Sequence, residues 1–124
     1  MRIEIRNISK SFEDGKIVLD NINLNDDIAS LAVIGPSGGG KSTLLRIMGG
    51  LLAMDGGEII VDGDRISSDG KNESRYLNEK ELIEYRRKIG FVFQKSGLFH
   101  HLTGRENIVL PLMKVHGLSE SEAN

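Results

Sequence analysis

Residues 35–42 read GPSGGGKS, from Gly35 to Ser42, and this stretch decides the fold of the chain. It matches the pattern G-x-x-x-x-G-K-[ST] at every fixed position. An apolar run at 31–34 precedes it, and a helix-forming segment at 43–48 follows it. This order predicts a buried strand, a glycine-rich turn and the start of a helix.

Such a turn is suited to binding phosphate groups. Gly38, Gly39 and Gly40 lack a Cβ and can adopt the positive φ that a tight turn requires. The turn directs several backbone N–H groups and the positive end of the helix dipole into one small concavity. Lys41 would reach the β- and γ-phosphates as a point charge, and the hydroxyl of Ser42 would ligate Mg²⁺. The arrangement therefore predicts a nucleoside triphosphate as the ligand.

Two other interpretations of this stretch compete with phosphate binding. An ordinary glycine loop between a strand and a helix is disfavoured, because the full pattern occurs in the strand–turn–helix context that it requires. The dinucleotide-binding pattern G-x-G-x-x-G is excluded, because Thr43 stands where the third glycine would be needed after Gly38 and Gly40.

The composition is that of one ordinary globular domain. The chain has 124 residues, of which 39% are hydrophobic and 27% charged. A net charge of −2 gives no electrostatic reason to expect nucleic acid as a partner. The absence of cysteine excludes disulfides and thiolate metal sites. No apolar run reaches membrane-spanning length and the first residues do not open a signal peptide, so any contact with a membrane is expected through a partner.

The first half of the chain predicts a small antiparallel sheet around the phosphate loop. Residues 2–8 alternate, with Ile3 and Ile5 on one face, and a second strand at 17–24 follows a turn at 13–16, so the two form a hairpin. The helix after the loop is expected to end at Gly49 and Gly50. A further strand is expected at 58–62, followed by a turn.

The second half predicts an exposed loop, helices and one more strand. We expect the loop at 66–76, a helix at 79–88 capped by Asn78, and a strand at 89–93. Basic residues at 86–88 are expected to form a solvated helix end. The sequence then predicts a capping box at Thr103 and Glu106, a kink or early end at Pro111, and a last helix at Ser119 just before the chain stops.

Several motifs together resemble the ATP-binding subunits of ABC transporters, and they come in that family's order and spacing. The resemblance covers nearly the whole chain but only the N-terminal half of the family's domain. It implies an α/β fold, a P-loop NTPase of ABC-ATPase type, with an N-terminal antiparallel β subdomain and the first part of a parallel-sheet core. Residues 1–124 would be a single partial domain, truncated before the second acidic motif and the signature motif. The motifs are Phe12, Val18-Leu19, GPSGGGKST at 35–43, Gly57-Glu58-Ile59, Phe93-Gln94, Leu98-Phe99 and His101-Leu102-Thr103 with Glu106-Asn107.

The resemblance assigns roles to individual residues. Phe12 would stack on adenine, where the family usually has tyrosine, although core filler is the default role of an isolated aromatic. Val18 would pack beside the base. Gln94 would approach the metal and the attacking water, against an alternative as a surface amide. The remaining contacts to phosphates or metal would come from Ser37, Gly38, Gly39, Gly40, Lys41, Ser42 and Thr43, with Thr43 at the α-phosphate.

The resemblance also implies cofactors and partners. ATP and Mg²⁺ would be bound between two ATP-binding subunits, and the loop after Gln94 would contact transmembrane permease subunits at the inner face of the cell membrane. Neither the second acidic motif nor the LSGGQ signature occurs, and Asp62 is expected in a turn rather than at a catalytic position. We therefore expect these 124 residues alone to hydrolyse little or no ATP.

Two alternatives remain open. A soluble ABC-type ATPase acting on nucleic acid or ribosomes would lack a membrane partner, but such proteins usually carry basic arms or coiled-coil inserts. An unrelated phosphate-loop kinase or GTPase is disfavoured by the hairpin before the loop and by Phe93-Gln94 after it. Adjacent His100 and His101 are a weak candidate for a metal pair, because adjacent rings rarely face one ion.

Overall fold

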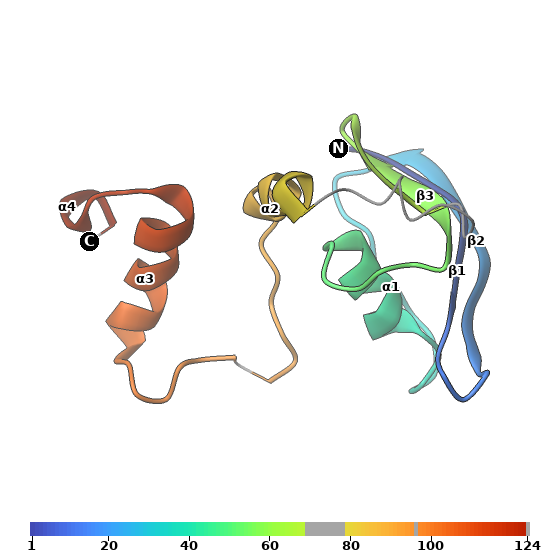
Figure 1. The fold of residues 1–124 in the computed structure, drawn as a ribbon, viewed down its shortest axis with the longest axis horizontal. Helices are drawn as coiled ribbons and strands as arrows, with labels where there is room; N and C mark the ends of the chain where they lie inside the picture. Colours follow the sequence, from blue (N-terminus) through green and yellow to red (C-terminus); the bar gives the residue numbers. More distant parts are fainter. Residues whose placement is uncertain (69–78, 96, 124) are drawn as a thin grey trace. The chain divides into compact units, whose positions relative to one another are not determined.

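Two units make up the chain, Met1–Arg86 and Arg87–Asn124, in a computed structural model that describes residues 1–68, 79–95 and 97–123 (Figure 1). The first unit contains most of the elements, and helix α2 ends at its boundary. The second unit contains two helices after an extended segment. The elements are β1 (Arg2–Ser11), β2 (Ile17–Asp27), α1 (Lys41–Met48), β3 (Gly56–Val61), β4 (Asp64–Ser68), α2 (Glu79–Arg87), α3 (Gly104–His116) and α4 (Glu120–Ala123).

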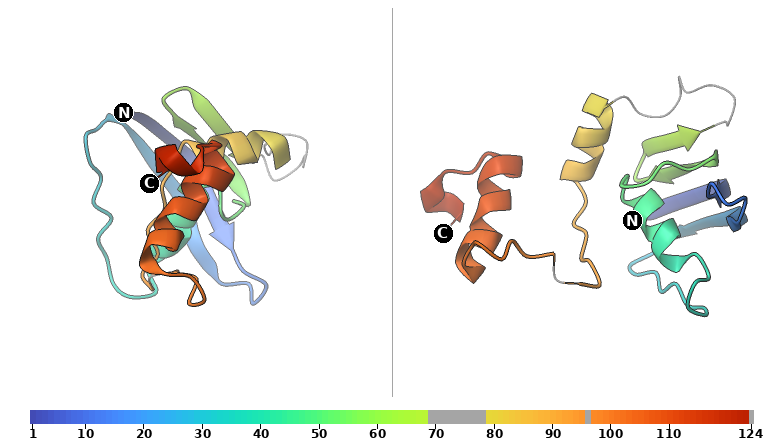
Figure 2. Two further views of the ribbon diagram at one scale, coloured as in Figure 1. Left: turned by 90° about the vertical axis from the view of Figure 1, so that its left-hand side faces the viewer. Right: turned by 60° about the horizontal axis from the view of Figure 1, so that its bottom comes forward.

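A four-stranded antiparallel sheet in the order β2-β1-β3-β4 forms the first unit. The predicted hairpin of β1 and β2 is confirmed, and β3 pairs along the other side of β1. The alternation in β1 places Ile3 and Ile5 on one face, where they are 0% and 2% exposed. Helix α1 lies on that side of the sheet and buries Leu44 and Ile47 (Figure 2). The core of the unit is therefore one sheet face covered by α1, and Leu82 and Tyr85 of α2 are buried as well.

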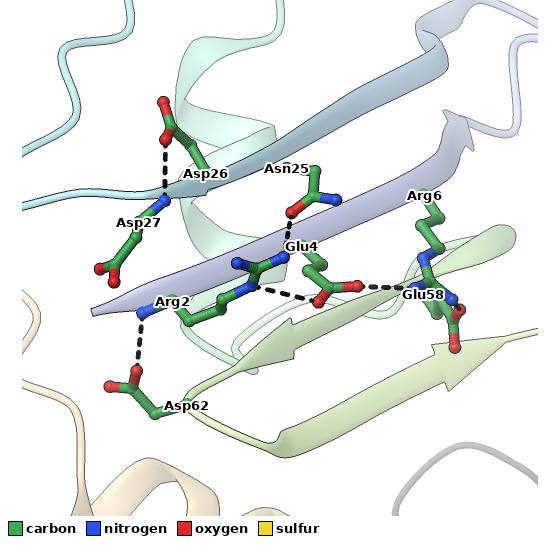
Figure 3. Close-up of polar contacts among 8 residues, drawn as sticks. All are labelled: Arg2, Glu4, Arg6, Asn25, Asp26, Asp27, Glu58 and Asp62. Atoms are coloured by element: carbon green, nitrogen blue, oxygen red, sulfur yellow. Dashed lines mark hydrogen bonds and ion pairs between the residues drawn. The ribbon is translucent and has the colours of Figure 1, made fainter.

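The opposite face of the sheet carries a ladder of charged side chains. Arg6 binds Glu4 at 2.6 Å and Glu58 at 2.9 Å, and Arg2 reaches Glu4 at 3.4 Å (Figure 3). Arg2 also donates to Asn25 at 3.0 Å. The arginine side chains are more than half exposed, so these ion pairs make this face hydrophilic but add little stability.

Two predicted strands do not form among the described residues. Residues 31–34 and 89–93 have no strand conformation, and Ile34 and Val92 are 93% and 95% exposed. The residues are apolar as a buried strand requires, which is why the sequence pattern indicated one. A parallel strand also needs neighbours that come from distant parts of a chain, and neither segment pairs with a described strand.

The loop predicted at 66–76 is wrong at its start. Residues 64–68 form β4, which pairs with β3, and Ile66 is fully buried opposite Ile59. The turn before β4 is as predicted: Asp62 has φ 47° and its carboxylate accepts a hydrogen bond from the Arg2 N–H at 2.7 Å. The rest of that loop and the predicted cap Asn78 lie outside the described residues.

Helix α3 in the second unit begins as predicted and ends later than predicted. Thr103 and Glu106 form a complete capping box. We expected a kink or an early end at Pro111; the helix continues past this residue to His116, so it does not end there. Gly117 caps the other end with φ 69°, and two well-fastened ends offset the hydrogen bond that proline removes. The predicted last helix forms as α4, with Ser119 and Glu122 hydrogen-bonded.

Candidate functional site

The loop before α1 makes the tight turn that its glycines permit. Gly38 and Gly40 have φ of 78° and 83°, in the left-handed region that favours glycine. The N–H of Gly39 donates to the carbonyl of Pro36 at 3.1 Å, which closes the turn. Gly40 is the N-cap residue of α1. The predicted strand before the loop is absent, but the predicted turn and helix are confirmed.

Strand β2 fixes this loop by direct backbone contact. A Cβ on Gly40 would lie 2.8 Å from the carbonyl oxygen of Val18 and 2.9 Å from a methyl carbon of Leu19. Gly40 is buried, and its missing side chain is what lets the loop approach β2 so closely. Val18 is thereby placed beside the start of α1, next to the loop.

The ammonium group of Lys41 is held at the loop by hydrogen bonds. Its Nζ donates to the carbonyls of Gly35 at 2.8 Å and Pro36 at 2.6 Å. An ammonium has three N–H donors, so two are used to fix its position and the third can serve a phosphate oxygen. The positive charge is thus held at the loop.

The N-terminus of α1 has the features of an anion site. No side chain of the described residues caps it, and its first turn contains no acidic residue. The first N–H groups of a helix have no partner within the helix, and the helix dipole favours negative charge beside them. Ser42 and Thr43 belong to this first turn, where Ser42 is exposed and Thr43 half-buried. With Lys41 beside it, this end of α1 suits an anionic group such as a phosphate.

The turn between β1 and β2 lies at the same end of the sheet as this loop (Figure 1), and Phe12 begins that turn. Phe12 directly follows Ser11, the last residue of β1, and Ser11 pairs with Ile17 in β2. Val18, the residue after Ile17, lies next to Gly40 of the loop. The turn is closed by a hydrogen bond from the Phe12 N–H to the carbonyl of Lys16 at 3.2 Å. The ring is 45% exposed rather than part of the core. Its place leaves it available to a ligand at the loop.

The other end of α1 is held by two residues whose role the sequence did not reveal. The hydroxyl of Tyr85 donates to the carbonyl of Met48 at 2.5 Å, and Nε and Nη2 of Arg86 donate to the carbonyl of Gly50 at 2.8 and 2.6 Å. Arg86 is exposed, as expected for a solvated helix end, and its guanidinium also hydrogen-bonds the carbonyl of Gly50. Tyr85 satisfies the carbonyl of Met48, one of those that a helix leaves without partners at its C-terminus.

Gln94 belongs to the second unit, where it is exposed at a bend and not at a strand end. The other residues of the sequence-predicted site, Phe12, Val18 and residues 37–43, all belong to the first unit. In the second unit the amide of Asn107 donates to the carbonyls of Phe99, Leu102 and Thr103 at 2.9–3.2 Å. It also accepts from the Phe99 N–H at 2.8 Å, so one side chain fastens residues 99–103 to α3.

This loop presents apolar side chains. Leu98 and Phe99 are 53% and 52% exposed. The His101 ring packs edge-on against Phe99 with centroids 5.8 Å apart.

Among the described residues no group of three His, Asp or Glu side chains could hold a metal, and His100 and His101 belong to no such group. The hydroxyl of Ser42, at the start of α1, could hold a Mg²⁺ ion together with phosphate oxygens and water.

Comparison with known proteins identifies the family. The model of the ABC transporter family matches residues 19–124, and the chain belongs to that family. It is 41% identical over 114 residues to the glucose import ATP-binding protein GlcV of Saccharolobus solfataricus, covering 90% of this chain and 30% of that protein. It is also 41% identical to the sulfate/thiosulfate import ATP-binding protein CysA of Pseudomonas aeruginosa, covering 99% of this chain and 34% of that protein.

The fold agrees with solved ATP-binding cassettes. A dimeric structure of the cassette MJ0796 in a post-hydrolysis state, bound to ADP and Pi, superposes with a TM-score of 0.79 at 35% identity. It covers 98% of this chain, and this chain covers 52% of it. The chain therefore spans about half of a solved cassette and about a third of the relatives above. No helix among the described residues is both long and apolar enough to cross a membrane.

Proposed function

We propose that this chain is the first part of the nucleotide-binding domain of an ABC transporter ATP-binding subunit, and that it binds Mg-ATP at residues 37–43. The observation that carries the proposal is the Lys41 ammonium held over a glycine turn at the uncapped N-terminus of α1. Family membership and the ADP- and Pi-bound state of MJ0796 support ATP as the nucleotide.

Each residue of the loop has a defined role in this proposal. Gly38, Gly39 and Gly40 surround the phosphates: the N–H groups of Gly38 and Gly40 bind phosphate oxygens, and that of Gly39 closes the turn. Lys41 neutralises charge on the β- and γ-phosphates. Ser42 ligates Mg²⁺, which supplies further charge neutralisation when bound. Ser37 and Thr43 contact phosphates at either side of the turn.

The base and the attacking water would be served by residues outside the loop. Phe12 stacks on the adenine ring, because base–aromatic stacking needs only an exposed ring face, and Val18 packs beside it. Gln94 approaches the metal and the attacking water, a role taken from the family resemblance. Hydrolysis also requires the second acidic motif and the signature motif, neither of which occurs in the 124 residues. This chain alone is therefore expected to turn over little or no ATP.

We propose two partners, a second ATP-binding subunit and a transmembrane permease, which would hold the subunit at the inner face of the membrane. The MJ0796 cassette is dimeric in its solved structure, and the relatives GlcV and CysA are named as import proteins. The names of these relatives favour a permease over nucleic acid or ribosomes. The loop after Gln94 suits a docking role because Asn107 fixes it while Leu98 and Phe99 stay exposed.

Phosphate release from ATP by the full-length protein tests the proposed activity. The wild type should release phosphate, and both Lys41→Ala and Gln94→Ala should reduce the rate at least about tenfold, since each removes a group that positions or neutralises the reacting phosphate. A rate unchanged by Lys41→Ala would contradict the proposal.

Co-purification with membrane subunits tests the proposed partner. Phe99→Ser should reduce the amount of permease recovered, whereas Ile108→Ser, which alters a 68% exposed apolar residue on α3, should not. Equal recovery with both variants would mean that the loop is not part of the interface with the permease.

A further inference from the structure

A charged cluster links the end of β1 to the segment before β3. The Nζ of Lys10 binds Oδ1 of Asp55 at 2.7 Å. The other oxygen of Asp55 accepts from the Ser11 N–H at 2.6 Å and from the Ser11 hydroxyl at 3.0 Å. Both carboxylate oxygens of Asp55 are thus used to fix two consecutive residues of β1, directly before Phe12.

The cluster continues onto the ring of Phe12. The Nζ of Lys10 lies over this ring, 5.6 Å from its centroid, within the range of a cation–π interaction. The Lys10 side chain is only 14% exposed, whereas Phe12 is 45% exposed. The ammonium occupies one face of the ring, and a flat ring has a second face for a stacked base.

Asp55 is suited to hold this lysine over a wide range of pH. Burial would raise the pKa of the Asp55 carboxyl, but the hydrogen bonds from Lys10 and Ser11 outweigh it and lower that pKa below its ordinary value of 3.8. The carboxylate is therefore charged at neutral pH and pairs with the ammonium.

We propose that Lys10 and Asp55 are positioning residues for Phe12, and that they set the affinity for the base of the nucleotide rather than for its phosphates. The inference rests on the proposed function, in which Phe12 stacks on the base. A ring already held in one orientation loses less conformational freedom when the base binds, so the stacking contact is stronger. The chain thereby separates phosphate recognition, at residues 37–43, from base recognition at the end of β1.

Two probes distinguish the two kinds of recognition: Mg-ATP, which has a base, and Mg-tripolyphosphate, which does not. Their affinities are measured on the full-length protein by calorimetry. Lys10→Met, which keeps the length of the side chain but removes the charge, should weaken Mg-ATP by about threefold to tenfold, the size of a cation–π contact. Its affinity for Mg-tripolyphosphate should stay unchanged. Asp55→Asn should act in the same direction.

Three further variants control for charge and for folding. Lys10→Arg keeps a cation over the ring and a partner for Asp55, so it should restore the wild-type affinity for Mg-ATP. Lys16→Met removes one exposed positive charge from the same turn and should leave both affinities unchanged. In a Phe12→Ala background, which itself should weaken Mg-ATP, Lys10→Met should have no further effect, because Lys10 acts through the ring.

The outcomes separate this inference from the proposed function. Equal loss of both probes with Lys10→Met, or a further loss in the Phe12→Ala background, would show that Lys10 attracts phosphate directly and would overturn the inference alone. Failure of the wild type to bind either probe would overturn the nucleotide site, and the inference with it. A selective loss of Mg-ATP that Lys10→Arg restores would support both.

Discussion

The antiparallel sheet and the apolar segments at 31–34 and 89–93 contain similar residues but differ completely in burial. Ile59 in β3 is 0% exposed, whereas Ile34 is 93% exposed. Tight turns at 13–16 and 62–63 join β1 to β2 and β3 to β4, and β1 also pairs with β3, which is far along the chain, so every strand of the sheet has a partner. The two segments have no paired strand among the described residues. An apolar pattern therefore predicts that a segment can be a strand, and the available partners decide whether it becomes one.

The largest effect predicted from this comparison is on stability. In the 124-residue chain, Ile59→Ala should lower the free energy of unfolding by about 2–5 kcal/mol, because it opens a cavity in the core. Ile34→Ala, the same chemical change at an exposed site, should lower it by less than about 0.5 kcal/mol. Urea unfolding followed by circular dichroism measures both. Similar losses for the two variants would mean that 31–34 is packed in solution.

A second pair compares two glycines of the phosphate loop. Both have positive φ, so an alanine at Gly38 should cost about 1–2 kcal/mol in strain. An alanine at Gly40 would also meet the Val18 carbonyl at 2.8 Å, and overpacking adds about 1–3 kcal/mol. Gly40→Ala should thus be the more destabilising change in the same unfolding measurement. The reverse order would contradict the contact between the loop and β2.

A third prediction concerns the end of α1 that faces α2. Arg86→Met should lower the free energy of unfolding by about 1–2 kcal/mol, because the Gly50 carbonyl loses a charged donor. Lys80→Met, on the exposed side of the same helix, should change it by less than about 0.5 kcal/mol. Equal effects would indicate that the hydrogen bonds from Arg86 to the Gly50 carbonyl do not stabilise the fold.

The smallest predicted effect is a pH dependence of α3. Hydrogen bonds from the N–H and hydroxyl of Thr103 lower the pKa of the Glu106 carboxyl below its ordinary value of 4.5. The stabilisation by Glu106 should therefore be complete above pH 4.5 and be lost as the pH falls through the lowered value. Circular dichroism against pH should show a helical signal that falls more in the wild type than in Glu106→Gln. Identical profiles would contradict this role.

The sequence predicted the local features of the fold and of the site well. The hairpin, the glycine turn, the start of α1 and the capping box at Thr103 depend on neighbours a few residues away, so a local pattern is sufficient. The β4 strand was missed because Ile66 stands among polar residues and its partner Ile59 is in another strand. The contacts of Arg86 and Asp55 were missed for a related reason: each joins residues that are far apart in the chain, and no spacing rule indicates such a contact.

Calorimetric titration of the full-length protein with Mg-ATP tests the central claim most directly, namely that the Lys41 ammonium over the glycine turn binds the nucleotide's phosphates. The wild type and a Lys80→Ala control should bind Mg-ATP with the same affinity. Lys41→Ala should bind at least about tenfold more weakly, the loss expected for a charged hydrogen bond to phosphate. Equal affinity for the wild type and Lys41→Ala, or no binding by a folded wild type, would contradict the account.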